Sequence, residues 1–209
     1  MRRYLILVMI VAAVGIAVFS FPQLPDRIPV HWNFHGEVDG YGSKSFGAFW
    51  GPGLAILIYL GFAFLPKIDP LGENYRRFRD TYIFLRDVLI AFFLALWVVP
   101  VIAGLGYPIN MNTALPVIMS LLMIVLGNYL GKVKRNWFLG IRTPWTLNSE
   151  EVWNKTHRLG GRAFLTAGLI SLGASFTPYG FQVMIGLVLA VTVLTVVYSA
   201  IIGRPSASQ

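Results

Sequence analysis

Along the chain, long apolar stretches alternate with shorter polar segments. A helix that crosses the hydrocarbon core of a membrane needs about 20 mostly apolar residues. Six stretches come close to this length with few charges, and we expect each one to form a helix. They are residues 4–21, 48–66, 86–106, 113–131, 161–177 and 179–202. The pattern predicts an all-α integral membrane protein with six transmembrane helices.

The segment between the first two spans, residues 22–47, has a different pattern. Three prolines in its first eight residues prevent the first helix from continuing. Apolar and polar side chains then alternate over residues 28–35, which is the period of an extended strand. Glycines from Gly36 onward supply turns. We expect a structured loop of extended and turning chain after span one, with a hairpin as one form of it.

The second long polar segment, residues 131–162, follows the fourth span. Asn148 precedes a helical run and Glu151 stands three residues later, which is typical of a helix N-terminus. We therefore expect a short helix over residues 149–159 outside the membrane. The two glycines that follow it allow a bend before the fifth span.

The composition agrees with a membrane protein. Hydrophobic residues make up 56% of the chain and charged residues only 12%, whereas soluble domains carry about 25% charged residues. The chain has no cysteine, which excludes disulfides, thiolate metal sites and a cysteine nucleophile. The net charge of +8 does not require direct nucleic-acid binding, because the placement of Lys and Arg also sets the orientation of membrane proteins.

Lys and Arg are distributed unequally between the two expected faces. The loop over residues 22–47 contains Arg27 and Lys44 alone, and the other fifteen of the 17 basic residues fall on the opposite face. Cytoplasmic loops carry the excess of Lys and Arg. We therefore expect a multi-pass protein of the cell (plasma) membrane with both termini cytoplasmic. Its two units are a two-span unit, residues 1–66, and a four-span unit, residues 67–209.

Three side chains of the outer loop, His31, His35 and Asp39, are of the types that ligate metals. On a helix their four-residue spacing would place them on one face, whereas on a strand His31, Asn33 and His35 would share one edge. The other interpretation is that these side chains hydrogen-bond within their own loop. We favour the second, because no complete ligand set of known spacing is present, and we expect no metal and no cofactor.

The inner loop has a denser pattern around Arg142, which stands between Ile141 and a Thr-Pro-Trp corner. An arginine in such a position can bind a carboxylate or phosphate with two N–H groups. The alternative is a loop folded onto the helix ends by its tryptophans, and both interpretations stay open. Asn128, at the inner end of span four, is expected to find partners on other helices, and His157 to be a structural hydrogen-bonding residue.

Catalysis has little support in this sequence. The His-Glu-x-x-His, Gly-x-Ser-x-Gly and phosphate-binding Gly-Lys-Ser/Thr motifs are all absent. The centres of the expected spans lack acids and bases, which argues against a proton-coupled pump. We expect the protein not to be an enzyme.

Two motifs resemble parts of a known family. The run from Leu24 to Lys44 resembles the small domain of unknown function that commonly precedes the SdpI region, and the run from Gly127 to His157 resembles the SdpI region itself. The outer motif residues are His31, Asn33, Gly36, Asp39, Ser43 and Lys44, and the inner motif residues are Asn128, Asn136, Gly140, Arg142, Pro144, Trp145, Trp153 and His157. The chain thus resembles the SdpI-type immunity proteins over most of its length.

The resemblance implies a function and partners. The best known members protect a bacterial cell against a secreted membrane-active peptide toxin and hold a cytoplasmic repressor at the membrane. It implies that the outer motif binds the ligand or toxin and that the inner motif binds the partner protein. Two other functions stay open: a small transporter or permease component with Pro100 as a moving part, and a metal-dependent membrane enzyme built on His31, His35 and Asp39.

Overall fold

The computed structural model describes residues 2–33 and 35–204, apart from the side chains of residues 2 and 3. Within these ranges the chain forms seven α-helices, two 3-10 helices and one two-stranded sheet. In chain order they are α1 (Arg2–Ser20), η1 (Phe21–Gln23), β1 (Arg27–Trp32), β2 (Val38–Ser43), α2 (Lys44–Ile68), η2 (Gly72–Phe78), α3 (Arg79–Gly104), α4 (Met111–Leu130), α5 (Pro144–Asn148), α6 (Glu150–Ala174) and α7 (Gly180–Ile202).

Five helical segments of the described chain are long and apolar enough to cross a membrane. They are Tyr4–Gln23, Lys44–Ile68, Gly72–Gly104, Met111–Leu130 and Gly180–Ile202. This agrees with the expected all-α membrane protein. α6 does not meet the criterion, because charged residues crowd its first half. The expected fifth span, residues 161–177, is therefore not confirmed by length and composition.

The separate short helix expected over residues 149–159 is wrong, because α6 runs on through Gly160 and Gly161. The second glycine serves close packing instead. A Cβ atom on Gly161 would lie 2.8 Å from the carbonyl oxygen of Gly127 in α4, and one on Gly127 would lie 2.4 Å from the backbone nitrogen of Leu165 in α6. Small residues let two helix backbones approach this closely.

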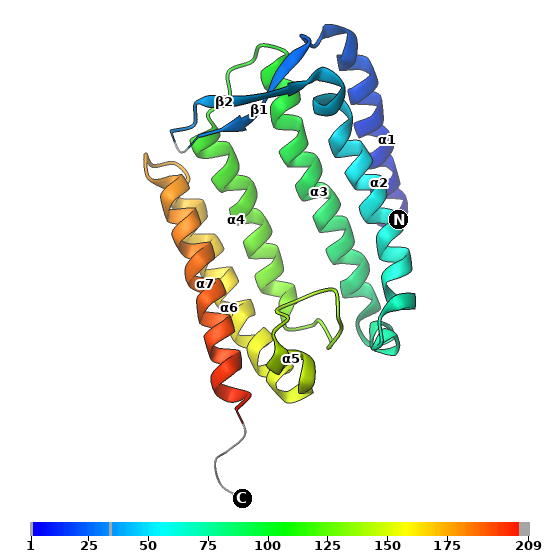
Figure 1. Ribbon diagram of the computed structural model, residues 1–209, viewed down its shortest axis with the longest axis vertical. Helices are drawn as coiled ribbons and strands as arrows, with labels where there is room; N and C mark the ends of the chain where they lie inside the picture. The colour runs from blue at the N-terminus through cyan, green and yellow to red at the C-terminus, as the bar shows by residue number, and fades with distance from the viewer. Residues whose placement is uncertain (1, 34, 205–209) are drawn as a thin grey trace, which may run out of the picture.

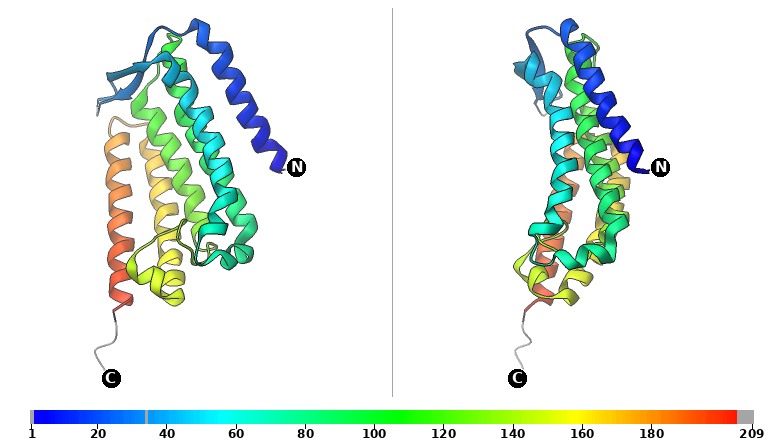
Figure 2. Two further views of the ribbon diagram at one scale, coloured as in Figure 1. Left: turned by 45° about the vertical axis from the view of Figure 1, so that its right-hand side comes forward. Right: turned by 90° about the vertical axis from the view of Figure 1, so that its right-hand side faces the viewer.

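The long helices form two groups that lie side by side (Figure 1). One contains α1, α2 and α3, and the other contains α4, α6 and α7. α3 and α4 are neighbours across the seam between the groups, and they touch less extensively than α4 and α6 do. The hairpin β1–β2 crosses one end of the bundle, and the loop over residues 131–143 with α5 lies at the opposite end (Figure 2).

Trp97 of α3 holds the first group together at the hairpin end. Its side chain is 1% exposed, and its indole N–H donates to the carbonyls of Gly47 and Ala48 in α2, at 3.0 Å each. A Cβ atom on Gly51 would lie 2.1 Å from the same ring. The Trp97 ring therefore leaves no room for a side chain at Gly51.

The hairpin is fixed to the helices by Ile28, which is fully buried with Leu24 and Ala48. The strands pair antiparallel from Arg27 opposite Ser43 to Trp32 opposite Val38, with the register shifting on either side of His31. The hairpin thus packs onto the helices through Ile28, whereas His31 on the same strand stays exposed.

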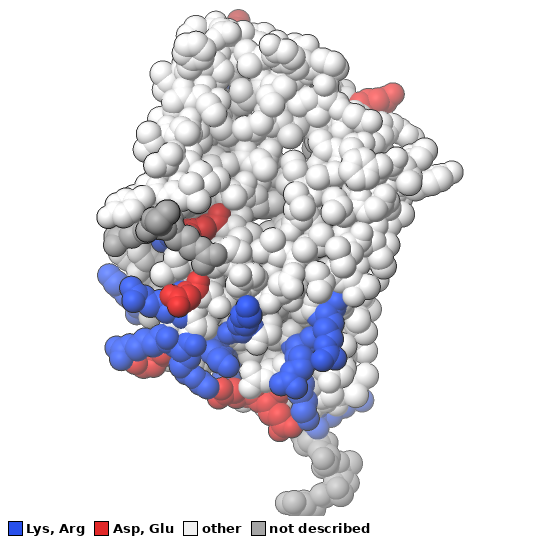
Figure 3. Space-filling view, turned by 180° about the vertical axis from the view of Figure 1, so that it is seen from behind, with Lys and Arg blue, Asp and Glu red and all other residues white. Residues whose placement is uncertain are grey.

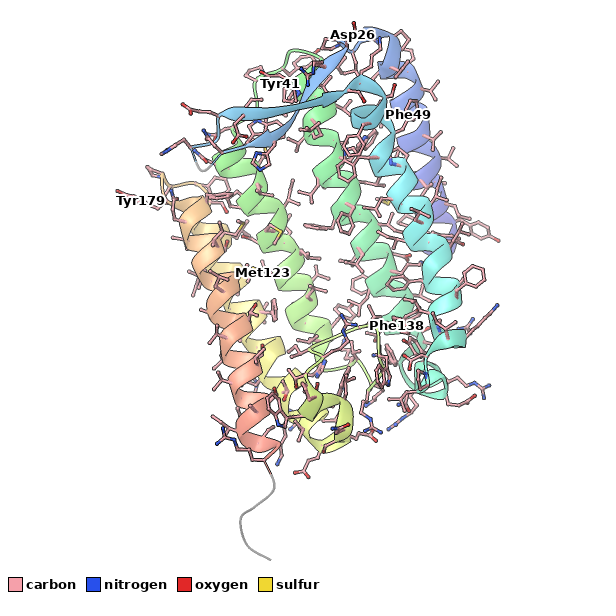
Figure 4. All side chains as sticks on the ribbon, in the orientation of Figure 1. Asp26, Tyr41, Phe49, Met123, Phe138 and Tyr179 are labelled. Carbon is pink, nitrogen blue, oxygen red and sulfur yellow. The ribbon has the colours of Figure 1, made fainter. Side chains whose placement is uncertain are left out.

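Basic side chains gather at the end of the bundle opposite the hairpin. On the face seen in the space-filling view, Lys and Arg cluster toward this end, and the surface above them carries few charges (Figure 3). In Figure 4, Phe138 of the inner loop lies at this basic end and Tyr41 of the hairpin lies at the other. The fold thus separates the two sequence motifs by the length of the bundle.

We predict that Gly127→Ala destabilises the protein by about 1–3 kcal/mol, because the added methyl group must push the α4 and α6 backbones apart. Gly173→Ala in α6 is the matched control, since its Cβ atom would meet nothing within 4 Å, and it should be neutral or slightly stabilising. Thermal unfolding of the purified protein in detergent measures both. Equal melting temperatures for the two variants would contradict the described contact.

Candidate functional site

A cavity of about 510 Å³ lies between the hairpin and the helices at the uncharged end. It lies where the two helix groups meet, since α2, α3, α4 and α7 all contribute to it. Most of its wall is apolar and includes Trp32, Trp50, Pro100, Leu115 and Phe181. Its polar groups come from His31, Asn33 and Asn112. Ligand sites typically combine a mostly apolar cavity of this size with a few convergent polar groups.

Asn33 builds the tip of the hairpin. Its side-chain oxygen accepts hydrogen bonds from the N–H groups of His35 and Glu37, at 2.8 and 3.1 Å, and its amide donates to the Glu37 carboxylate at 3.0 Å. Gly36 follows with φ +77°, and a Cβ atom there would lie 3.0 Å from the side chain of Asn112. Glycine is therefore required twice over, by the backbone conformation and by the contact with α4.

His31 and Asp39 face each other across the hairpin. The imidazole Nδ1 lies 2.5 Å from a carboxylate oxygen of Asp39, and the two side chains are 71% and 43% exposed. This pair lies at the register shift of the strands. Because the pair is solvated, it contributes little to stability, and both groups stay accessible to a ligand.

Ser43 and Lys44 lie at the other end of the hairpin, away from its tip. The Ser43 hydroxyl caps α2 by accepting from the N–H of Phe46 at 3.3 Å. The Lys44 ammonium lies 3.3 Å from Asp26 and over the ring of Phe21. The structure therefore gives these two motif residues local structural contacts, and it does not gather them with His31 and Asn33.

The three-ligand metal arrangement of His31, His35 and Asp39 does not form. No group of three or more His, Asp and Glu side chains comes together as a metal site within the described ranges. The hairpin turn accounts for this, because it pairs His31 with Asp39 and places His35 at the tip. There the His35 carbonyl accepts a hydrogen bond from Asn112 at 3.0 Å.

The inner motif is organised by Asn136, which is fully buried. Its side-chain oxygen accepts from the N–H groups of Phe138 and Leu139 at 2.8 and 2.7 Å, and its amide donates to the carbonyls of Lys134 and Leu139. The Tyr75 hydroxyl of η2 lies 3.3 Å from the same oxygen. Asn136 thus shapes the loop and joins it to the other helix group.

Gly140, Trp153 and His157 form one packed unit. The imidazole stacks on the indole at 4.0 Å, its Nε2 accepts from the N–H of Ile141 at 3.0 Å, and its Nδ1 donates to the Trp153 carbonyl at 2.8 Å. Gly140 has φ +110°, and a Cβ atom there would lie 2.3 Å from the imidazole Nε2. Burial lowers the pKa of His157 to about 4. These contacts agree with the structural role expected for His157.

Arg142 is exposed, and one of its guanidinium N–H groups donates to the Trp137 carbonyl at 2.9 Å. Pro144 is the first residue of α5, which the Thr143 side chain caps. Trp145 packs against Gly203 at the end of α7. The loop is therefore folded onto helix ends, and the Arg142 guanidinium keeps a solvent-facing side.

Asn128 does not find partners on other helices. Its amide donates at 2.9 Å to the Ile124 carbonyl one turn earlier in α4, and its side chain is exposed. An i to i−4 bond within the same helix satisfies the amide without a neighbour. The expectation of a contact between helices was therefore wrong.

Two residues that hold the motifs in place were not identified from the sequence. Asp69 is 7% exposed and accepts from the N–H of Leu71, the hydroxyl of Tyr75 and the N–H of Trp137, all within 2.9 Å. Asn112 ties the hairpin tip to α4. The only sequence signal was their position beside helix ends, where Asp and Asn commonly bond to backbone groups.

We predict that the free energy of unfolding falls by about 2 kcal/mol between pH 7 and pH 5 because of His157. The folded-state pKa of about 4 lies below the usual 6.5. The unfolded chain therefore binds a proton in this range while the folded protein does not, and stability is lost as pH falls. His157→Gln keeps an acceptor for Ile141 and should unfold with a flatter pH dependence in chemical denaturation. An unchanged slope would contradict the assignment.

Comparison with known proteins matches both parts of the chain. Residues 8–56 match a domain of unknown function (DUF1648), and residues 132–202 match the SdpI/YfhL protein family. The immunity protein SdpI of Bacillus subtilis (strain 168) is 26% identical over 182 residues, covering 86% of this chain and 84% of that protein. No solved structure matches. Both matched regions stand in the order that the motifs predicted, and together with the five membrane-spanning candidates they support a multi-pass membrane protein of the SdpI type.

Proposed function

We propose that this protein protects a cell against a secreted membrane-active peptide toxin by binding the peptide at the hairpin end of the bundle. The similarity to an immunity protein over most of both chains supports the biological role. The cavity beneath the hairpin supports the mode of action and is the observation that carries the proposal. Its apolar wall suits a hydrophobic peptide side chain, and its polar groups suit peptide N–H and C=O groups.

The proposed topology places the hairpin outside the cell and the basic end in the cytoplasm. The gathering of Lys and Arg at the end opposite the hairpin supports this orientation. We also propose that α6 crosses the membrane as a sixth span, with its crossing part after Arg162. α6 packs against both α4 and α7, and a helix shielded by neighbours needs less apolar surface than one surrounded by lipid.

A peptide bound beneath the hairpin can change the exposure of the inner loop at the basic end if the two helix groups shift relative to each other. A second, wholly apolar cavity of about 270 Å³ lies between α3 and α4, and Ile118 lines both it and the outer cavity. The seam is thus loosely packed next to the proposed peptide site. At the other end, the loop over residues 131–143 contacts Tyr75 of η2 through Asn136, and Asp69 at the end of α2 through the N–H of Trp137. The inner loop therefore bridges the two helix groups at the basic end, and the hairpin bridges them at the other end through Asn112.

We propose that this inner loop, with the exposed Arg142, binds an acidic surface on a cytoplasmic repressor when the peptide is bound. A peptide that favours one spacing of the helix groups would change the exposure of the loop. Such coupling requires that peptide and repressor both prefer the same state. The apolar lining of the seam gives no support to a permease for polar solutes.

We predict that Leu115→Trp abolishes protection, because the larger ring fills the outer cavity. The peptide concentration that kills half of the cells should fall by about tenfold or more, which corresponds to a loss of about 1.4 kcal/mol of binding. The assay is survival of a sensitive strain that expresses the protein and is challenged with a membrane-active peptide of the Sdp type.

Leu57→Trp is the matched control, since Leu57 is 67% exposed on α2. It should protect as well as the parent at an equal amount of protein in the membrane. Full protection by Leu115→Trp would exclude the cavity as the peptide site. Loss of protection in both variants would point to damaged folding and would remove this support for the proposal.

We predict that Arg142→Glu prevents recruitment of the cytoplasmic partner and leaves protection intact, because the site for the peptide lies at the other end of the bundle. Peptide-dependent photo-crosslinking of cytoplasmic proteins to a probe at position 137 measures recruitment. Arg158→Glu on α6 makes the same charge change outside the loop and should crosslink normally. Equal crosslinking by both variants would remove the loop from the mechanism.

A further inference from the structure

A second large cavity, of about 710 Å³, opens at the basic end where α2 ends and α3 begins. Four basic residues line it: Lys67, Arg76, Arg79 and Arg86. It lies on the first helix group and shares no residue with the cavity beneath the hairpin. Its chemistry is therefore different from that of the proposed peptide site.

Two of these cations have no acidic partner. Arg76 pairs with Glu73 at 3.2 Å and Arg86 pairs with its neighbour Asp87 at 2.7 Å, whereas none of the ion pairs among the described residues involves Lys67 or Arg79. The other acid in the wall, Asp69, is buried and already accepts three hydrogen bonds. Lys67 and Arg79 are thus available to an anion from outside.

A groove that is mainly apolar, although Arg79 and Arg86 also line it, continues from this basic mouth. A cavity of about 350 Å³ shares Ala63, Arg79, Ile83 and Arg86 with the first and adds Tyr59. The residues recur every three or four positions on α2 and α3, so the groove follows one face of this helix pair. Arg86 lies where the basic cavity meets the groove. Its guanidinium lies 4.6 Å from the centre of the Tyr59 ring, and its side chain is 13% exposed.

We propose that this cavity binds one anionic phospholipid. The phosphate lies between Lys67 and Arg79, and one acyl chain follows the groove past Ala63 and Ile83. A guanidinium matches a phosphate with two parallel N–H groups, and basic pockets between membrane helices on the cytoplasmic side suit anionic headgroups. The apolar groove distinguishes a lipid from free phosphate, which would need only the mouth. This site does not depend on the proposed toxin immunity.

The test counts lipids retained by the purified full-length protein in native mass spectrometry. Phosphatidylglycerol should be retained as one molecule per chain, and phosphatidylcholine with the same acyl chains should not. The double variant Lys67→Gln/Arg79→Gln should bind phosphatidylglycerol about tenfold more weakly or worse. The double variant Lys132→Gln/Arg158→Gln removes the same charge elsewhere at this end and should bind like the parent.

Two further measurements separate the alternatives. Ala63→Phe fills the groove without changing charge and should release the lipid, whereas Leu57→Phe on the lipid-facing side of α2 should not. Equal losses in the two charge variants would show general attraction to the basic end and would overturn the site. Displacement of the lipid by millimolar inorganic phosphate would show a free-phosphate site and would overturn the lipid assignment. The thermal unfolding of each variant confirms that it is folded.

Discussion

Two helix groups with little direct contact are held side by side, and this constraint governs the rest of the structure. At the basic end, the buried carboxylate of Asp69 binds Tyr75 of its own group and the N–H of Trp137 in the inner loop. At the other end, Asn112 of α4 binds the hairpin tip. The Asp69 carboxylate is buried, and leaving such a group unpaired costs about 1–3 kcal/mol, whereas the Asn112 bond is exposed. The two bridges therefore set how far apart the groups lie.

The motif residues are of two kinds. Some shape the two loops, and others keep exposed surface that a partner can reach. Asn33, Gly36, Asn136, Gly140 and His157 shape the two loops. His31 and Arg142 keep solvent-exposed surface. A loop whose backbone is held by its own side chains presents the exposed groups in one geometry, which favours recognition because less freedom is lost on binding.

The two ends of the bundle have different surfaces and therefore suit different ligands. Beneath the hairpin, the cavity is mostly apolar and lies on the seam between the groups. At the basic end, the cavity lies within one group, between α2 and α3. A ligand at the seam can act on the spacing of the groups, whereas the proposed lipid at the α2–α3 corner would contact one group only.

The sequence by itself determined the membrane class, the position of most helices and the resemblance to the SdpI family. The apolar length of a span can be read from one stretch of sequence. The alternation at residues 28–35 is local in the same way, and it marked the hairpin region. Other features depended on residues far apart in the chain. Gly161 packs against Gly127 of another helix. Asp69 bridges the helix groups because the N–H of Trp137 binds it. Lys67 and Arg79 line one cavity because α2 and α3 pack together. Tertiary structure decided these, because hydrogen bonds and steric contacts act between neighbours in space, whatever their separation in the sequence.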